Sequence, residues 1–332
     1  MHRLNSMKLS IVIPAYNEEQ NIGLCLTELR KAVRDEHQIP YEIIVVNDNS
    51  SDDTERMVRD QMELDASVRI VNRTMLGGFG RAIRSGLEAV AGDVVVICMA
   101  DLSDDPQDVV AYYRKINEGY DCVFGSRFIP GSRVEKYPVV KLFVNRIVNT
   151  CIRVLFWTRF NDLTNAFKAY RTSVIRDCGP FRSSHFNITL ELSLSALIRN
   201  YNIAQIPISW YGRAWGASNL RIGEMGRRYL CTVLMFYFQR ILIRDDVVAE
   251  QLAKQYHWRD HQDDIENRLS RLESVLAAVN EEFATPAGAS TQTPVASRKL
   301  PLKNPHAVEP IVPPPREPAP TGHTIAAQLE AM

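Results

Sequence analysis

The sequence lacks three features that would each indicate a class of protein. It has no excess charge, because 39 Lys and Arg residues balance 39 Asp and Glu residues. That balance argues against a whole-chain attraction to nucleic acid. Its 6 cysteines form no CxxC pair and no Cys/His cluster with zinc-ligand spacing. No apolar run approaches the roughly 20 residues of a spanning helix, and residues 1–8 contain no apolar signal core. We expect a globular chain that is soluble or lies on a membrane surface.

The cysteines also indicate a compartment. Cys98 and Cys122 lie in apolar, strand-like runs, where a buried free thiol is expected. Free thiols are typical of a reducing environment, so we expect the protein on the cytoplasmic side.

The C-terminal part has a different composition from the rest. Residues 284–332 contain ten of the 17 prolines and no aromatic residue, which predicts a disordered tail. Before it, within 246–283, apolar residues follow a 4-3-4-3-4 spacing typical of a coiled-coil seam: Ile265, Leu269, Leu272, Leu276, Val279 and Phe283. Two interpretations stay open for 265–283, a homo-oligomer contact or a helix packed on its own domain.

Residues 8–125 alternate short apolar runs with helical patterns. Strands are predicted at Leu9–Ile13, Glu42–Val46, Val68–Val71, Val94–Cys98 and Cys122–Phe124. Helices are predicted between them at Asn21–Val33, Asp53–Met62, Gly80–Val90 and Pro106–Glu118. This order indicates an α/β fold with a largely parallel sheet. Ligands of such sheets bind beyond the carboxyl ends of the strands.

The segments that follow the five strands carry small, acidic or basic residues. They are Pro14-Ala15-Tyr16-Asn17-Glu18-Glu19, Asn47-Asp48-Asn49-Ser50, Leu76-Gly77-Gly78-Phe79-Gly80, Met99-Ala100-Asp101-Leu102-Ser103-Asp104-Asp105 and Gly125-Ser126-Arg127. Further on come Asp162-Leu163-Thr164-Asn165-Ala166-Phe167-Lys168 and Gly216-Ala217-Ser218-Asn219-Leu220. Together, over about residues 8–245, these motifs resemble those of family 2 glycosyltransferases, and in particular of polyprenyl-phosphate glycosyltransferases such as dolichol-phosphate mannose synthase.

The resemblance implies a GT-A fold, a Rossmann-like nucleotide-sugar transferase domain with amphipathic interface helices. The implied reaction moves a sugar from a donor of the GDP-mannose or UDP-glucose type to a polyprenyl (dolichol or undecaprenyl) phosphate. A phosphate acceptor is already ionised at neutral pH, so no strong general base is required. We expect in-line displacement with inversion, assisted by positioning and charge stabilisation.

The resemblance also implies roles for particular residues. Nucleotide contacts fall on Pro14, Tyr16, Glu18, Asp48, Gly78 and Gly80. The residues with implied catalytic roles are Asp101, Arg127, Lys168 and Arg213. Those implied to bind the acceptor phosphate are Arg127, Arg146 and Ser218. The residues implied to bind a divalent cation, Mg²⁺ or Mn²⁺, are Asp101, Ser103, Asp104 and Asp105. Met99 stands where the family has a first aspartate, and thioether sulfur is a poor ligand for these cations. Asp104 has a second interpretation, as the cap of the helix that begins at Pro106.

Two segments have the character of interface helices. Residues 137–157 form a basic amphipathic pattern with no acidic residue. Residues 225–245 contain an apolar stretch, Tyr229–Ile243, that is flanked by arginines and too short to span a membrane. We expect a GT-A domain over 8–224 and a peripheral position on the cytoplasmic face of a membrane, without a spanning helix. A core helix of a soluble enzyme is the alternative for 137–157. Two alternatives for function also stay open, a transferase with a polysaccharide or soluble acceptor and a non-catalytic nucleotide-sugar-binding scaffold.

Overall fold

The computed structural model describes residues 7–212, 222–242, 269–270 and 272–274. The chain divides into two compact units, Met1–Ile265 and Glu266–Met332. In the second unit the described residues are helical. The predicted oligomer contact over 265–283 stays a prediction. The predicted tail, Arg213 and Ser218 lie outside the described residues.

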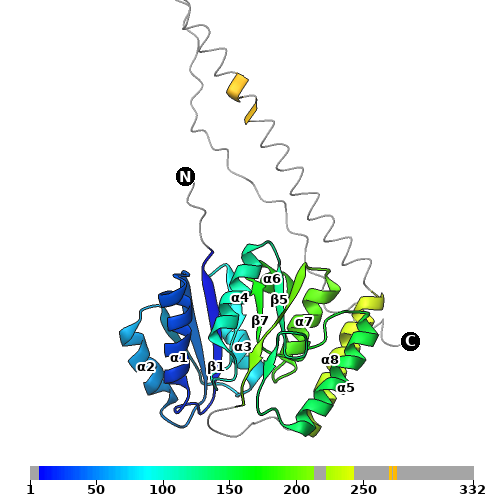
Figure 1. Cartoon of the computed structure of the whole chain (residues 1–332), viewed down its shortest axis with the longest axis horizontal. Coiled ribbons are helices and arrows are strands. Elements are labelled where there is room, and N and C mark those ends of the chain that lie inside the picture. Colours follow the sequence, from blue (N-terminus) through cyan, green and yellow to red (C-terminus); the bar gives the residue numbers. More distant parts are fainter. Residues whose placement is uncertain (1–6, 213–221, 243–268, 271, 275–332) are drawn as a thin grey trace, which may run out of the picture. The chain divides into compact units, whose positions relative to one another are not determined.

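A seven-stranded sheet forms the centre of the first unit (Figure 1), in the order β3-β2-β1-β4-β7-β5-β8. Its strands are β1 (Leu9–Ala15), β2 (Tyr41–Asp48), β3 (Val68–Arg73), β4 (Val94–Ile97), β5 (Cys122–Ser126), β7 (Lys168–Arg171) and β8 (Ile203–Pro207). A small second sheet pairs β6 (Arg133–Val134) with β9 (Ser209–Trp210) in parallel. The five strands predicted from apolar runs are all present.

Helices cover both faces of the sheet, because successive side chains of a buried strand point to opposite sides. Along β1, Leu9, Ile11 and Ile13 join one core and Val12 joins the other. The first core contains residues of α1 (Ile22–Arg30), the π-helix η1 (Lys31–Glu36), α2 (Thr54–Leu64) and α4 (Pro106–Asn117). The second contains residues of α3 (Phe79–Glu88), α5 (Val139–Phe156), α6 (Thr172–Cys178), α7 (Ile188–Ile198) and α8 (Ile222–Leu242). This arrangement of a central sheet between two layers of helices confirms the predicted α/β class.

The sheet is mixed rather than wholly parallel. Strand β7 lies between β4 and β5 and is antiparallel to both. Its four residues, Lys-Ala-Tyr-Arg, include two cations, so no apolar run marks it in the sequence. This insertion places the loop before Lys168 next to the end of β5, because Phe124 pairs with Lys168.

Two further expectations concern the described part of the chain. All six cysteines are free, and Cys98 and Cys122 are buried, as expected. Within residues 7–212 and 222–242, no helix is both long and apolar enough to cross a membrane.

Candidate active site

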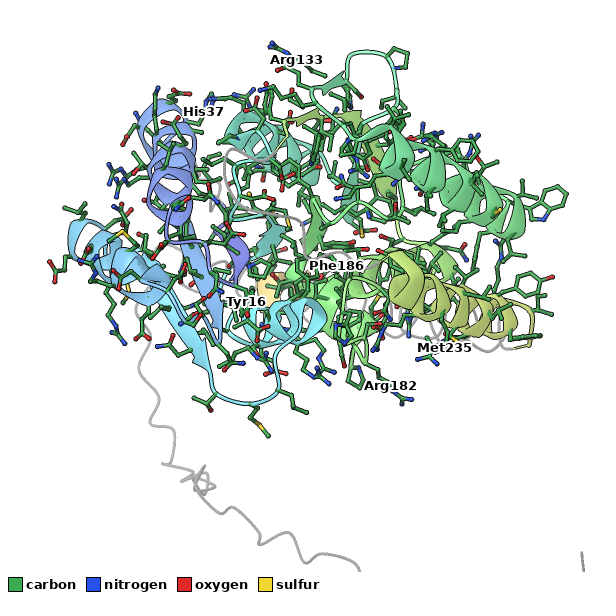
Figure 2. All side chains as sticks on the ribbon, turned by 90° about the horizontal axis from the view of Figure 1, so that it is seen from below. Tyr16, His37, Arg133, Arg182, Phe186 and Met235 are labelled. Atoms are coloured by element: carbon green, nitrogen blue, oxygen red, sulfur yellow. The ribbon has the colours of Figure 1, made fainter. Side chains whose placement is uncertain are left out.

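The ends of β1 to β3 form one side of the candidate site. Pro14 is buried at the end of β1, and Tyr16 follows with half of its surface exposed. Figure 2 shows this edge from below, with Tyr16 and Phe186 near its middle. Glu18 is partly buried, and its carboxylate accepts a hydrogen bond from the Asn21 amide at 2.6 Å. The expected nucleotide residues of this segment therefore lie at the carboxyl edge of the sheet.

Asp48 is fixed by two neighbours rather than open to solvent. Its side chain is 8% exposed and pairs with Arg73, the last residue of β3. Its other oxygen accepts the backbone N–H of Gly78 at 2.6 Å. Asp48 thus ties the ends of β2 and β3 to the start of α3. The sequence did not predict Arg73 as a site residue, because it belongs to none of the motifs.

The glycines at the start of α3 admit protein backbone at close range. A Cβ on Gly80 would lie 2.5 Å from the carbonyl oxygen of Ser183, and one on Gly78 would lie 2.5 Å from that of Ser184. Gly78 also has a φ of +150°, which disfavours a side chain. The two glycines therefore admit the backbone of residues 183–185, and their expected nucleotide contacts stay a prediction. The stacked rings of Phe79 and Phe186, 4.3 Å apart, hold the same contact.

The acidic group follows β4. Asp101 and Ser103 are 3% exposed, and Asp104 is 6% exposed. A carboxylate oxygen of Asp101 accepts the Ser103 N–H at 3.1 Å, and one of Asp104 accepts the Met99 N–H at 3.0 Å. Burial raises the pKa of Asp104 to about 7; the Met99 N–H opposes this, and the charge of Asp101 adds to it. The two carboxylates are therefore close enough to repel each other.

Asp105, not Asp104, caps the following helix. Its carboxylate accepts the backbone N–H of Gln107 at 2.9 Å, with Pro106 at the first helical position. The capping interpretation of Asp104 was therefore wrong. This capping hydrogen bond explains why an aspartate stands directly before Pro106.

The acidic group is suited to a divalent cation of the Mg²⁺ kind. Among the described residues no group of three or more His, Cys, Asp or Glu side chains could hold a metal on its own. Mg²⁺ commonly uses one or two carboxylates and takes its remaining ligands from water and substrate phosphates. The buried carboxylates of Asp101 and Asp104, whose like charges repel each other, match that requirement. The thioether of Met99 adds no suitable ligand.

Arg127 forms a buried, two-pronged ion pair. Its Nε and Nη2 each lie 2.8 Å from an oxygen of Asp162, whose side chain is fully buried. Burial alone would lower the pKa of Arg127, but the charge and hydrogen bonds of Asp162 outweigh it and the pKa is raised. Nη1 lies 3.4 Å from the Tyr137 hydroxyl. The pair joins the end of β5 to the loop that precedes β7, and the arginine stays charged.

Lys168 is turned toward that loop. It is 1% exposed, and its Nζ donates to the carbonyl oxygens of Leu163, at 2.7 Å, and Asn165. Burial lowers the pKa of Lys168 to about 7, with Asp162 opposing and Arg127 reinforcing the change. A neutral amine has two N–H groups, which matches the two carbonyls. The side chain holds the loop and does not line the cavity described below.

Arg146 and Asn149 fix the same loop from α5. Arg146 donates to the Asn161 carbonyl at 3.1 Å, and its guanidinium lies 4.6 Å from the ring centre of Phe128. Asn149 is fully buried and accepts the Leu163 N–H at 2.7 Å. The polar arc of this helix therefore faces the protein.

The apolar arc of α5 faces outward instead. Exposed apolar side chains along it include Val140 at 69%, Phe143 at 67% and Val154 at 71%. On α8, Leu230 is 58% and Phe238 is 54% exposed. A helix of a soluble core would bury this arc, so the core-helix alternative does not describe α5. An outward apolar face of this extent marks an interaction surface.

A cavity of about 760 Å³ connects the acidic group to these helices. Its lining includes residues that follow β4 and β5, which are Met99, Asp101, Ser103, Asp104 and Arg127. It also includes Lys136, Tyr137 and Lys141, together with apolar side chains of α5 and α8: Val144, Ile147, Val148, Cys151, Ile152, Leu155, Tyr229, Leu230, Val233 and Leu234. The cavity thus combines acidic, basic and apolar side chains in its lining.

The structure brings together part of the predicted site. Asp101, Ser103, Asp104 and Arg127 line the cavity, whereas Arg146, Lys168 and Asp105 do not. The predicted nucleotide residues lie at the neighbouring strand ends. Lys136 and Lys141 were missed as site residues. Their signal in the sequence was two lysines flanking Tyr137-Pro138 at the start of a predicted helix.

Comparison with known proteins bears on the same part of the chain. The polyprenol monophosphomannose synthase of Mycolicibacterium smegmatis is 27% identical over 216 residues, which cover 63% of this chain and 80% of that protein. The dolichol-phosphate mannosyltransferase of Pyrococcus furiosus is 28% identical over 222 residues, covering 65% and 60% respectively. The chain therefore spans less than two-thirds of that second relative.

A similar solved structure supports the fold. It is glucosyl-3-phosphoglycerate synthase from Mycobacterium tuberculosis, in complex with Mn²⁺, uridine diphosphate and glucosyl-3-phosphoglycerate. It matches with a TM-score of 0.54 at 22% identity, over 69% of this chain and 80% of that one.

A family model decides the assignment. The model described as glycosyl transferase family 2 matches residues 10–179, more than half of the 332 residues. That match extends from β1 through α6 and includes the acidic and basic cavity residues Asp101, Asp104, Arg127, Lys136 and Lys141. The chain belongs to glycosyl transferase family 2 and is a glycosyltransferase.

Proposed function

We propose that this glycosyltransferase moves a sugar from a nucleotide donor to a polyprenyl phosphate at a membrane surface. One observation carries the proposal: a single cavity is lined by the acidic residues after β4, by two lysines and by a groove of apolar side chains from α5 and α8. A polyprenyl phosphate matches this lining, because it joins an anionic phosphate to a long apolar chain. The two relatives named above act, by their names, on polyprenol or dolichol phosphates and transfer mannose.

The donor would lie at the acidic end. Asp101 and Asp104 would hold a Mg²⁺ or Mn²⁺ ion, which neutralises the charge of the donor diphosphate when bound. Ser103 would stay next to the ion. The nucleotide would extend toward Tyr16 and Asp48, at the ends of β1 and β2. The relatives' names favour transfer of mannose, so GDP-mannose is the first donor to test and UDP-glucose is the comparison.

The acceptor would enter from the groove. Lys136 and Lys141 would attract its phosphate, because both line the same cavity as the acidic residues and the apolar side chains. Arg127 would add a fixed positive charge near the reacting atoms. Its bond to Asp162 restricts it to one orientation. Arg213 and Ser218 stay candidate phosphate contacts on the strength of their motif alone.

Catalysis would then depend on position and charge. An ionised phosphate oxygen attacks the anomeric carbon from the side opposite the nucleotide, and the configuration inverts. No histidine lines the cavity within the described residues, and an ionised acceptor needs no base. Groups held in place before the reaction stabilise the departing diphosphate without further reorganisation.

The outward apolar faces of α5 and α8 would lie in the membrane interface, with the enzyme peripheral to the bilayer. The free cysteines favour its cytoplasmic face. Membership of a transferase family favours an enzyme over the non-catalytic scaffold.

The test is a donor and acceptor screen with the full chain. Radiolabelled GDP-mannose and UDP-glucose are each incubated with undecaprenyl phosphate, dolichyl phosphate or 3-phosphoglycerate, with and without Mg²⁺ or Mn²⁺. We expect cation-dependent transfer into the lipid fraction. Transfer to 3-phosphoglycerate alone would support the soluble-acceptor alternative and contradict the proposal.

Two variants locate the site. Asp101→Ala should abolish transfer and leave the unfolding transition in place, with the half-exposed Asp35→Ala as the control. Lys141→Gln should raise the KM for the lipid phosphate about tenfold, which corresponds to one charge-assisted hydrogen bond. Full activity of Asp101→Ala would contradict the cation assignment.

A further inference from the structure

Two aromatic side chains line the 760 Å³ cavity together with its charged residues. They are Trp210, the last residue of β9, and Tyr137, which precedes α5, and both are partly buried. Their ring centres lie 4.8 Å apart at 62°, an edge-to-face contact. Neither residue has a role in the reaction proposed above, and neither belongs to one of the motifs that resemble the family.

The backbone places Trp210 beside the acidic residues after β4. Trp210 and Asp104 face each other in an isolated antiparallel bridge, and the Tyr211 N–H donates to the Ser103 carbonyl at 2.9 Å. Facing residues of such a pair point their side chains to the same side, with Cβ atoms about 5 Å apart. The Trp210 side chain therefore leaves the backbone next to that of Asp104.

Tyr137 lies against the buried arginine of the cavity. Its hydroxyl accepts a hydrogen bond from Nη1 of Arg127 at 3.4 Å, and the guanidinium carbon lies 5.4 Å from its ring centre. Burial raises the pKa of Asp104 and the charge of Arg127 opposes that rise, so these two charged groups are also close to each other. The carboxylate, the aromatic pair and the arginine are thus one cluster.

The sugar ring has to lie near the same two charged groups. In the proposed function, Asp104 holds the donor diphosphate through a cation and Arg127 lies near the reacting atoms. In-line displacement keeps the anomeric carbon between the leaving and the attacking oxygen. The C–H bonds of a pyranose ring are weakly positive, and the face of an aromatic ring is negative. An aromatic pair beside Asp104 and Arg127 is therefore suited to bind the sugar ring.

We propose that Trp210 and Tyr137 form the subsite for the pyranose ring of the donor. The sugar would lie against the ring of Trp210, and Tyr137 would keep that ring in place through their edge-to-face contact. Trp210 then contacts the substrate, whereas Tyr137 is a positioning residue. The proposal rests on the donor position of the proposed function, and it names the residues that bind the sugar rather than the nucleotide.

Matched pairs of ligands separate the sugar from the nucleotide. GDP-mannose and GDP, and UDP-glucose and UDP, are each titrated into the full chain by calorimetry with Mn²⁺ and without acceptor. For a pair that the wild type binds, Trp210→Leu should weaken the sugar nucleotide about tenfold, as expected for the loss of an aromatic contact. The affinity for the free diphosphate should change less than twofold.

Conservative variants show whether the rings themselves matter. Trp210→Phe, which keeps an aromatic ring, should restore most of the affinity for the sugar nucleotide. Tyr137→Leu should give the same selective loss as Trp210→Leu, and Tyr137→Phe should not. A loss in Tyr137→Phe equal to that in Tyr137→Leu would contradict the positioning role, because the ring contact remains in Tyr137→Phe.

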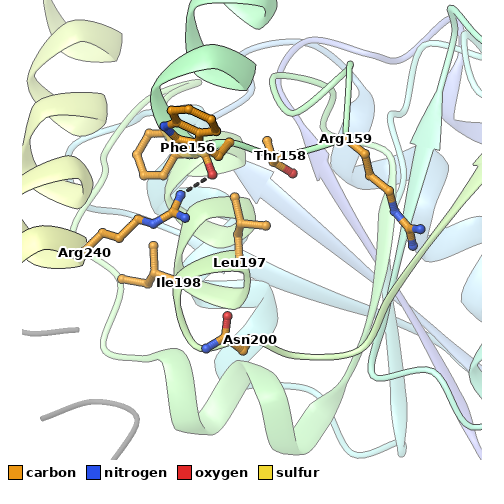
Figure 3. Close-up of a pocket in the computed structure, with 8 residues that line it drawn as sticks. Phe156, Thr158, Arg159, Leu197, Ile198, Asn200 and Arg240 are labelled. Carbon is orange, nitrogen blue, oxygen red and sulfur yellow. Dashed lines mark hydrogen bonds between the residues drawn. The ribbon is translucent and has the colours of Figure 1, made fainter. Parts of the chain in front are cut away.

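Trp157→Leu is the matched control. Trp157 is 90% exposed and lines a separate cavity of about 360 Å³, which Figure 3 shows beside Phe156 and Arg240. This variant should keep both affinities within twofold of the wild type. Equal losses of sugar nucleotide and diphosphate in Trp210→Leu would mean a merely structural tryptophan and would overturn the proposal. An unchanged affinity for the sugar nucleotide would overturn it as well.

The result also separates this subsite from the proposed acceptor. Because no acceptor is present, a loss confined to the sugar nucleotide would support the subsite even if no transfer to a polyprenyl phosphate is found. Absence of transfer would then count against the proposed acceptor alone. Absence of binding of all four ligands to the wild type would overturn the subsite together with the proposed donor position.

Discussion

The buried lysine before β7 gives the sharpest prediction, and it concerns stability against pH. Lys168 is 1% exposed and its folded pKa is about 7, against 10.5 for an ordinary lysine. Above pH 7 the unfolded chain therefore binds nearly one more proton than the folded chain. Stability rises with pH in that range, by up to about 1.4 kcal/mol per pH unit. Integrated from pH 7 to pH 9 for these two pKa values, the gain is about 2 kcal/mol. This contribution is lost as the pH falls from 10.5 toward 7.

Lys168→Met removes the titrating group and keeps a similar volume. The free energy of unfolding is measured by urea denaturation of both proteins at pH 7, 8 and 9. The wild type should gain about 2 kcal/mol relative to Lys168→Met over this interval. Lys31→Met, at an exposed lysine, should follow the wild type. Parallel profiles for the wild type and Lys168→Met would refute the reasoning, because they would mean that the buried amine keeps its ordinary pKa.

Three further predictions follow from named contacts. Asp162→Asn leaves Arg127 buried without its charge partner, so the free energy of unfolding should fall by roughly 3–5 kcal/mol in urea denaturation. Gly80→Ala places a Cβ against backbone carbonyls and should cost roughly 1–3 kcal/mol, whereas Gly23→Ala, with open space around it, should stabilise α1 by up to about 1 kcal/mol. Phe143→Ser should leave stability within about 0.5 kcal/mol and weaken vesicle binding about tenfold.

Each of these has a control and a contrary result. Asp35→Asn, at a half-exposed carboxylate, should change stability little, and an equal loss in both aspartate variants would contradict the buried-pair argument. Equal effects of the two glycine variants would mean that residues 183–185 yield to the added methyl group. Leu64→Ser, at an equally exposed position on α2, should leave vesicle binding unchanged. If it does not, the membrane contact is not confined to α5 and α8.

Much of the fold could be predicted because its signals are local. The Val- and Ile-rich runs that form β1, β2 and β4 are buried on both faces, and such strands give unbroken apolar patterns. Strand β7 gave no such pattern, since it is four residues long and half of them are cations. Its place in the sheet depends on pairing with β4 and β5, which are distant in the sequence.

The candidate site divides in the same way. Asp101 and Arg127 could be found because each follows a strand, and strand ends converge at one edge of the sheet. The hydrogen bonds of Lys168 could not be predicted. A lysine in a motif looks the same in the sequence whether it binds a phosphate or donates to two backbone carbonyls. Likewise, the capping role considered for Asp104 belongs to Asp105, because the choice depends on backbone geometry at a single residue.

The sequence by itself determined the order of strands and helices up to β5, the family motifs and the places of the acidic and basic groups along the chain. These depend on residue type and spacing along one chain. Only the tertiary structure decided which way the groups face. It turned the asparagine side of α5 inward and its apolar side outward, because Asn149 satisfies the backbone of the loop at Leu163. It also opened the cavity between α5 and α8, whose walls come from segments more than 60 residues apart in the sequence.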